Sequence, residues 1–157
     1  AYMMLLPVTK AQMVRARFRT VVQLELLQIL ACVPFMVLRA RYGHLNNAVG
    51  IEANAAFLGL GLVQMGLFNL VFFPMHYRNG YDIGKPFVAA SIAELFYIAA
   101  AETCDHVIPY MKTVCESYAI ADQLRQLPVL LGGAAVYAGL TALALRSSVR
   151  RFERVDL

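Results

Sequence analysis

Four long apolar stretches, separated by short polar segments, limit what this chain can fold into more than any other feature. They cover residues 21–38, 53–73, 86–101 and 127–145. A helix rises about 1.5 Å per residue, so roughly 20 apolar residues cross the hydrocarbon core of a bilayer, which is about 30 Å thick. The second and fourth stretches pass this test, the first does so with Glu25 inside it, and the third needs its flanking residues. The pattern therefore predicts four membrane-spanning segments.

The composition leaves little material for a surface that faces water. Hydrophobic residues make up 60% of the chain and charged residues only 15%, whereas an average soluble domain has roughly 25% charged residues. This excludes a disordered chain, and it leaves a soluble bundle with a very apolar core as the less favoured alternative. An open sheet would leave backbone groups unpaired in lipid. We therefore expect an all-α integral membrane bundle of four transmembrane helices.

Basic residues lie at the ends of the apolar stretches, which favours contact with a membrane surface over nucleic acid. The chain has 14 Lys and Arg residues and 10 Asp and Glu residues, a net charge of +4. If the spans alternate in direction, ten basic residues share one side and four share the other, and the positive-inside rule places the larger set and both termini in the cytoplasm. The larger set is Lys10, Arg15, Arg17, Arg19, Arg78, Lys85, Arg146, Arg150, Arg151 and Arg154. The smaller set is Arg39, Arg41, Lys112 and Arg125.

We expect one membrane domain over residues 1–157, made of a cytoplasmic amphipathic helix (7–20), a four-span region (21–146) and a cytoplasmic tail (147–157). In the helix, Thr9 and Gln12 fit a capping box, in which each side chain satisfies a free backbone N–H of the other residue. Val14 and Phe18 recur at helical spacing among basic residues. Two interpretations stay open, an interfacial helix on anionic headgroups and a docking helix for a cytoplasmic partner.

Several segments resemble parts of bacterial ABC-2 type transporter permeases. MMLLPVTKAQMVRARF (residues 3–18) is similar to the coupling helix between the second and third spans of that family. FFPMHYRNGYDIGKPF (72–87) is similar to its aromatic-rich turn after the fourth span, and RRFERVDL (150–157) to its charged tail. Family members have six spans, so the resemblance implies that the four stretches are spans three to six. It also implies that two spans precede Ala1, where the chain starts abruptly.

The resemblance implies the permease subunit of an ATP-binding cassette exporter in the cytoplasmic membrane of a bacterium. Such a subunit is not an enzyme and holds no cofactor, because ATP and Mg are bound by a cytoplasmic ATPase. It works with a second permease copy or a homologue. The residues expected to contact the ATPase are Pro7, Val8, Thr9, Lys10, Gln12, Met13 and Arg17.

Between the second and third stretches, Asn79-Gly80 predicts a turn, bracketed by Pro74 and Pro86. One interpretation is a plain turn at the membrane interface. The other, strengthened by the resemblance, is a rigid cytoplasmic elbow that moves with the ATPase. Gly84-Lys85 is not part of a phosphate-binding loop, since Asn79 and Pro86 stand where such a loop requires Gly and Ser or Thr. The elbow residues are Tyr77, Arg78, Gly80, Tyr81, Gly84 and Lys85.

Polar residues inside the apolar stretches are costly in lipid and indicate functional positions. We expect Gln64, Asn69 and Glu94 to lie on a substrate path, with structural pairing of Glu94 to Gln64 or Asn69 as the alternative. Glu25 is expected to face water near the cytoplasmic end, because Gln28 follows one turn later. These residues fit no reaction template, which argues against a small intramembrane enzyme. A structural or regulatory protein with a lipid-binding basic helix remains the alternative function.

Cys104 and Cys115 lie in the segment placed outside the cell, where a disulfide is favoured, so they form a candidate pair. With His106 they would make a weak metal site, since three mixed ligands without a repeated motif rarely hold a metal. We therefore expect no metal ion in this chain.

Overall fold

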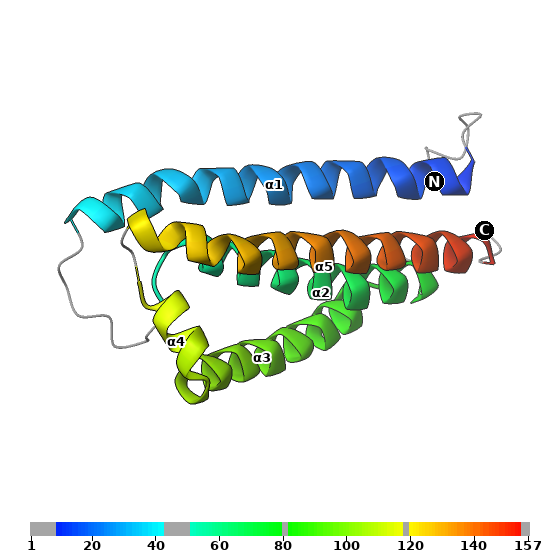
Figure 1. Cartoon of the computed structure of the whole chain (residues 1–157). Coiled ribbons are helices and arrows are strands. Elements are labelled where there is room, and N and C mark those ends of the chain that lie inside the picture. Colours follow the sequence, from blue (N-terminus) through cyan, green and yellow to red (C-terminus); the bar gives the residue numbers. More distant parts are fainter. Residues whose placement is uncertain (1–8, 43–50, 80–81, 118–119, 155–157) are drawn as a thin grey trace.

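The computed structural model describes residues 9–42, 51–79, 82–117 and 120–154. In these ranges all regular structure is helical (Figure 1). The helices are α1 (Lys10–Tyr42), α2 (Ala55–Asn79), α3 (Gly84–Val107), α4 (Pro109–Cys115) and α5 (Ile120–Glu153). Helices α1, α2, α3 and α5 are each long and apolar enough to cross a membrane. The all-α architecture and the four long apolar helices expected from the sequence are therefore confirmed.

Helix α1 is continuous over 33 residues, so the basic segment does not form a separate helix before the first span. The predicted capping box is present: the Thr9 amide donates to Gln12 Oε1 (2.9 Å) and the Gln12 amide donates to Thr9 Oγ1 (3.2 Å). No Pro or Gly lies between Lys10 and Ala31 to stop the helix. The basic segment and the first apolar stretch therefore form one helix, because basic residues change the surface of a helix without breaking it.

Helices α2 and α5 lie side by side along most of their length (Figure 1), and glycines allow their close approach. A Cβ atom on Gly133 would come within 2.7 Å of the Gly59 Cα and closer still to its carbonyl. A Cβ on Gly59 would lie 2.6 Å from the Val129 carbonyl oxygen. Small residues bring backbones together in membrane helix pairs. The Gly59–Gly133 contact therefore defines the crossing point of this pair.

Two apolar clusters lie at opposite ends of the α2–α5 pair. The first contains Val14, Phe18, Tyr77 and Ala144, and the Phe18 and Phe73 ring centroids are 4.5 Å apart. The apolar face predicted for the basic segment is thus used inside the fold, against α2 and α5. Tyr77, one of the predicted elbow residues, is buried in this cluster. The second cluster contains Ala56, Val114 and Cys115.

Large apolar side chains cover the outer faces of the long helices. Leu30 and Phe35 on α1 are 65% and 70% exposed, and Phe96 on α3 is 71% exposed. No residue in the most apolar 18-residue window of α1 is buried inside the fold. Such extensive apolar surface is not typical of a soluble monomer. It indicates a membrane protein, in which lipid or other spanning helices cover these faces.

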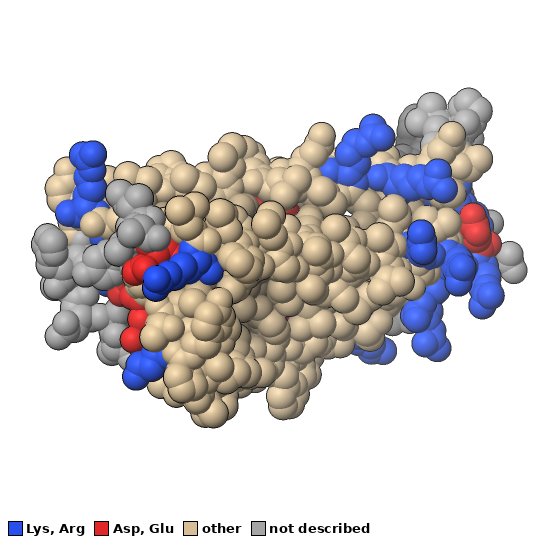
Figure 2. All heavy atoms as spheres, viewed as in Figure 1, with Lys and Arg blue, Asp and Glu red and all other residues tan. Residues whose placement is uncertain are grey.

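In the view of Figure 2 the Lys and Arg side chains gather at the two ends of the bundle, and the belt between these ends is almost entirely uncharged. The first turns of α1 and the last turns of α5 lie at the same end, where Lys and Arg side chains are concentrated. Basic and acidic side chains are mixed at the other end. This distribution fits spans that alternate in direction, because each crossing then returns the chain to the opposite end.

The mixed-charge end is fastened by buried amides and one ion pair. Asn54 Nδ2 donates to the carbonyls of Cys115 (2.8 Å) and Ser117 (2.9 Å), and Gln126 Nε2 donates to those of Val114 (2.9 Å) and Ser117 (2.8 Å). Arg39 forms a two-point pair with Glu52 through Nε (3.1 Å) and a terminal nitrogen (3.2 Å). These contacts join α1, α2, α4 and α5 at one end.

Helix α2 ends at Asn79, where the sequence predicts a turn, but it is not limited by Pro74 as expected. Helix α2 runs through Pro74 to Asn79, so Tyr77 and Arg78 are helical. A proline inside a helix leaves the carbonyl four residues earlier without its usual donor, and membrane helices tolerate this. Separately, Arg151 on α5 donates to the Pro74 carbonyl at 3.4 Å and so joins α5 to this turn of α2. Gly84 and Lys85 begin α3, whereas Gly80 and Tyr81 lie outside the described residues.

Cys104 and Cys115 are both free thiols, so the candidate disulfide is not formed. Cys104 is exposed on α3, whereas Cys115 is completely buried at the end of α4. The Cys115 carbonyl also accepts the Glu52 amide at 3.0 Å, which holds this residue inside the second cluster. Because α4 packs against Ala56, the Cys115 thiol is buried, whereas the Cys104 thiol is exposed.

We expect the two thiols to differ strongly in reactivity. Burial and the nearby Asp105 carboxylate raise the pKa of Cys115 to about 11, and a raised thiol pKa keeps the unreactive protonated form. At pH 8 the thiolate fraction would be about 0.001, against roughly 0.2 for an ordinary thiol. In a Cys32→Ala background, maleimide should label Cys104 more than ~100-fold faster than Cys115, measured by mass spectrometry. Denaturation should equalise the rates. Labelling of neither thiol until a reductant is added would contradict the structure.

Candidate functional site: an acidic cavity between three helices

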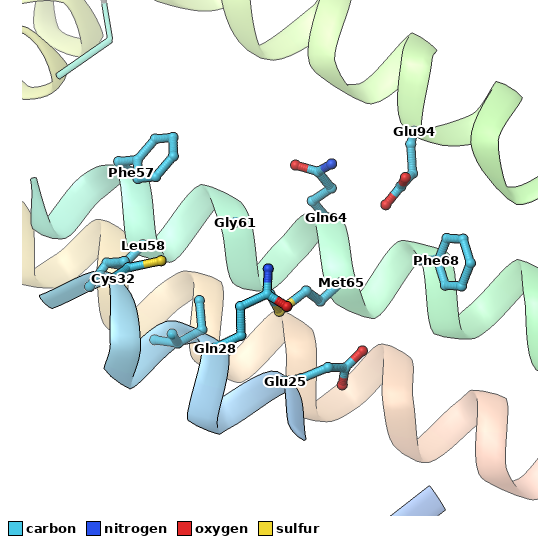
Figure 3. A pocket seen from close by; sticks show the side chains of 11 residues that line it. Glu25, Gln28, Cys32, Phe57, Leu58, Gly61, Gln64, Met65, Phe68 and Glu94 are labelled. Atoms are coloured by element: carbon cyan, nitrogen blue, oxygen red, sulfur yellow. The ribbon is translucent and has the colours of Figure 1, made fainter. Parts of the chain in front are cut away.

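A cavity of about 340 Å³ lies between α1, α2 and α3 (Figure 3). Each of these helices contributes polar groups to it: Glu25 and Gln28 from α1, Gln64 from α2 and Glu94 from α3. The apolar part of the lining includes Cys32, Phe57, Leu58, Met65 and Phe68. Two carboxylates thus share one cavity that is otherwise bounded by amide, aromatic and aliphatic groups, and none of its lining residues is basic.

Glu25 is held by a hydrogen-bond network that spans three helices. Its Oε2 accepts the Tyr137 hydroxyl (2.7 Å) from α5 and the Asn69 Nδ2 (3.1 Å) from α2. Asn69 Nδ2 also lies 3.4 Å from the Thr141 hydroxyl. Both bonds to the carboxylate end on the same oxygen, which fixes the direction of the side chain. A buried polar network of this kind rigidifies the helices that it joins.

Glu94 reaches the same cavity from α3. Its carboxylate interacts with the Gln64 side chain, and Figure 3 shows the two groups pointing toward each other across the space between α3 and α2. An amide can donate to a carboxylate and still keep its carbonyl oxygen for another partner. Gln64 is therefore placed to donate to Glu94 across the cavity.

A second cavity of about 250 Å³ lies next to the first, between α2 and α3. The two cavities share Phe57, Gly61 and Gln64. The second is also lined by Tyr97, whose hydroxyl donates to the Leu60 carbonyl at 2.9 Å, and by Glu102. Glu94 and Glu102 are eight residues apart on α3, about 12 Å along the helix. Polar groups thus extend from the first cavity toward the mixed-charge end.

The three path residues predicted from the sequence are only partly brought together. Gln64 and Glu94 both line the cavity, from α2 and α3. Asn69 does not line it, but its amide holds Glu25. Glu25 was expected to face interfacial water, yet it is half-buried beneath Tyr137 and Asn69.

The sequence interpretation missed Tyr137 and Thr141 as members of the site. They lie one helical turn apart on α5, in a stretch that is otherwise apolar. Hydroxyl groups repeated at this spacing mark one face of a helix. That signal could have identified them, although not their partner on α1.

The residues predicted to contact an ATPase lie at the terminal end, away from the cavity. Thr9, Gln12 and Arg17 are exposed, Lys10 and Met13 are half-buried, and Pro7 and Val8 lie outside the described residues. The exposed Thr9 and Gln12 side chains are already used to cap α1. Arg17 lies near the buried Tyr77 hydroxyl, so its positive charge interacts with that group. The hydroxyl makes no hydrogen bond to another described residue.

Within the described ranges, no three His, Cys, Asp or Glu side chains are grouped closely enough to hold a metal ion. The cavity therefore offers two separated carboxylates and not a metal centre. Comparisons of the chain with protein-family models, with curated proteins and with solved structures found no match.

Proposed function

We propose that this chain is the transmembrane permease subunit of an ATP-driven transporter, with ATP hydrolysed by a separate cytoplasmic subunit. One observation carries the proposal: a single continuous helix joins the exposed basic end of α1 to the acidic cavity. Lys10 and Glu25 are 15 residues apart, about 22 Å along the helix axis. A force applied at the basic end would therefore reach the cavity through a rigid element.

Helix α1 is attached to the rest of the fold at three points, which is the arrangement expected of a lever. Val14 and Phe18 pack into the first cluster near the N-terminal end. Glu25 is held by Tyr137 in the middle, and Arg39 by Glu52 near the C-terminal end. Large apolar side chains between these points are exposed. Tilting α1 would change the cavity wall while the α2–α5 pair stays in place.

The proposal includes the partners implied by the resemblance to ABC-2 type permeases. The ATPase binds the α1 end and supplies the ATP and Mg site. A second permease copy or a homologue completes the path, because four spans are few to enclose one. The membrane is the cytoplasmic membrane of a bacterium, with both termini in the cytoplasm, since the ten basic residues lie toward that end.

Purification in mild detergent from native membranes tests the ATPase contact. We expect a soluble ATPase in stoichiometric amount, identified by ATP hydrolysis in the eluate. Reversing Lys10 and Arg17 to Glu should reduce its recovery at least tenfold. Reversing Arg150 and Arg154 to Glu makes the same charge change at the same end of the molecule, on α5, and should leave recovery unchanged.

Two results would count against this function. Equal loss of the ATPase in both double variants would remove the assigned contact on α1. Absence of any ATPase, together with salt-sensitive binding to anionic vesicles, would favour a structural or regulatory membrane protein. The exposed basic side chains at the terminal end (Figure 2) are the observation that supports that second candidate.

A further inference from the structure

We propose that the cavity between α1, α2 and α3 binds a small lipophilic organic cation. The inference names a substrate class for the proposed transport function and rests on that function for its biological meaning. It depends on the shape of the cavity, its charge and its aromatic lining.

The size of the cavity limits the class of ligand. A volume of about 340 Å³ lies at the lower end of the range for sites that hold small organic molecules. A polysaccharide, a folded peptide or a whole lipid does not fit in this space. A compact molecule with two or three small rings does.

The charge of the cavity selects a cation. Glu25 and Glu94 enter it from different helices, and none of its lining residues is basic. A carboxylate in a low-dielectric environment is costly unless an opposite charge lies close to it. Arg39 does not supply that charge, since it pairs with Glu52 near the far end of α1. A bound cation would provide the missing charge.

The orientation of Glu25 leaves one carboxylate oxygen available. Tyr137 and Asn69 both donate to Oε2, and no described residue is hydrogen-bonded to Oε1. Asn69 is only 1% exposed, and its own Oδ1 also lacks a partner in the described part of the chain. Glu25 lines the cavity, so its Oε1 is an acceptor without a described donor there, and the Asn69 amide behind it adds no positive charge. This acceptor is suited to a group of positive potential and not to an anion.

The apolar lining selects an organic cation over an inorganic one. Phe57, Met65 and Phe68 line the cavity. Aromatic faces attract cations within about 6 Å of the ring centroid, and more strongly when water is excluded. An inorganic ion would instead need several oxygen ligands, and the first cavity offers two carboxylates and two amides on different helices. Apolar walls and separated negative charges fit a delocalised or shielded positive charge.

Binding of methyltriphenylphosphonium to the purified chain in nanodiscs tests the proposal without an ATPase. Triphenylphosphine oxide is the matched neutral probe, because it has nearly the same shape without the charge. By isothermal titration calorimetry we expect the cation to bind at least tenfold more tightly than the oxide. Glu94→Gln and Glu25→Gln should each weaken cation binding at least tenfold, whereas Glu116→Gln, an exposed acid at the end of α4, should not change it.

The design separates misfolding from loss of the site. Glu25 also joins helices, so its variant could alter the fold. The Glu94→Gln variant and the comparison of the two probes on the unaltered chain test cation binding without relying on the Glu25→Gln variant. Equal affinity for both probes, unchanged cation binding in Glu94→Gln, or no binding of the cation would overturn the proposal. None of these results affects the test of the ATPase contact.

Discussion

Gly133→Ala is expected to destabilise the fold by about 3 kcal/mol, as an overpacked helix contact does. The added methyl group would overlap the Gly59 backbone, with its Cα only 2.7 Å away. Backbone atoms cannot rotate aside as the end of a side chain can, so α2 and α5 must separate. Titration with sodium dodecyl sulfate in mixed micelles, followed by circular dichroism, measures the change in the free energy of unfolding.

The neighbouring glycine supplies the control for this prediction. Gly132 is exposed, and a Cβ there meets nothing within 4 Å. Gly132→Ala should be neutral or stabilise the fold by up to about 1 kcal/mol, since Ala is the better helix former. Equal effects of the two substitutions would show that α2 and α5 do not cross at Gly59 and Gly133.

Gln126→Leu is expected to lower the free energy of unfolding by about 3 kcal/mol. Gln126 is completely buried, accepts the Ala55 amide at 3.1 Å and donates to the carbonyls of Val114 and Ser117. Leucine fills a similar volume but makes none of these bonds, and an unsatisfied buried group costs roughly 1–3 kcal/mol. Because Asn54 still reaches both carbonyls, the Ala55 amide suffers the clearest loss.

The same unfolding titration measures this loss, with Gln123→Leu as its control. Gln123 lies almost one turn earlier on α5, is half-buried and has no side-chain hydrogen bond to another described residue. Its replacement should therefore change stability by less than about 0.5 kcal/mol. A Gln126→Leu variant as stable as the control would mean that α4 does not dock against α5 through this side chain.

Features governed by neighbours in the chain were predictable. The capping box of Thr9 and Gln12 forms as expected, because it joins residues three positions apart. Gln64 and Glu94 stand out in the sequence because both interrupt apolar stretches, and the structure places both of them in one cavity. The expectations that failed were those in which a tertiary contact outweighed a preference of the local sequence. Pro74 was expected to limit the second helix, but α2 continues through it to Asn79, and Tyr77 in this last part of the helix packs into the first cluster.

The candidate site depended on contacts that no local pattern contains. Glu25 and Tyr137 are separated by 112 positions and meet at 2.7 Å. Their meeting follows from the crossing of α2 and α5 and from the placement of α1 over that pair. Cys115 likewise became buried through the docking of α4 and not through its spacing from Cys104.

The amino-acid sequence by itself determined that the chain is helical, that four of its helices can cross a membrane, and where the first helix begins. Those properties follow from the length of apolar stretches and from hydrogen bonds within a few residues. Only the tertiary structure decided which polar side chains meet and where a cavity remains. The physical reason is that apolar faces specify burial but not partners, whereas backbone approach at glycines and the geometry of buried hydrogen bonds select one arrangement of the helices.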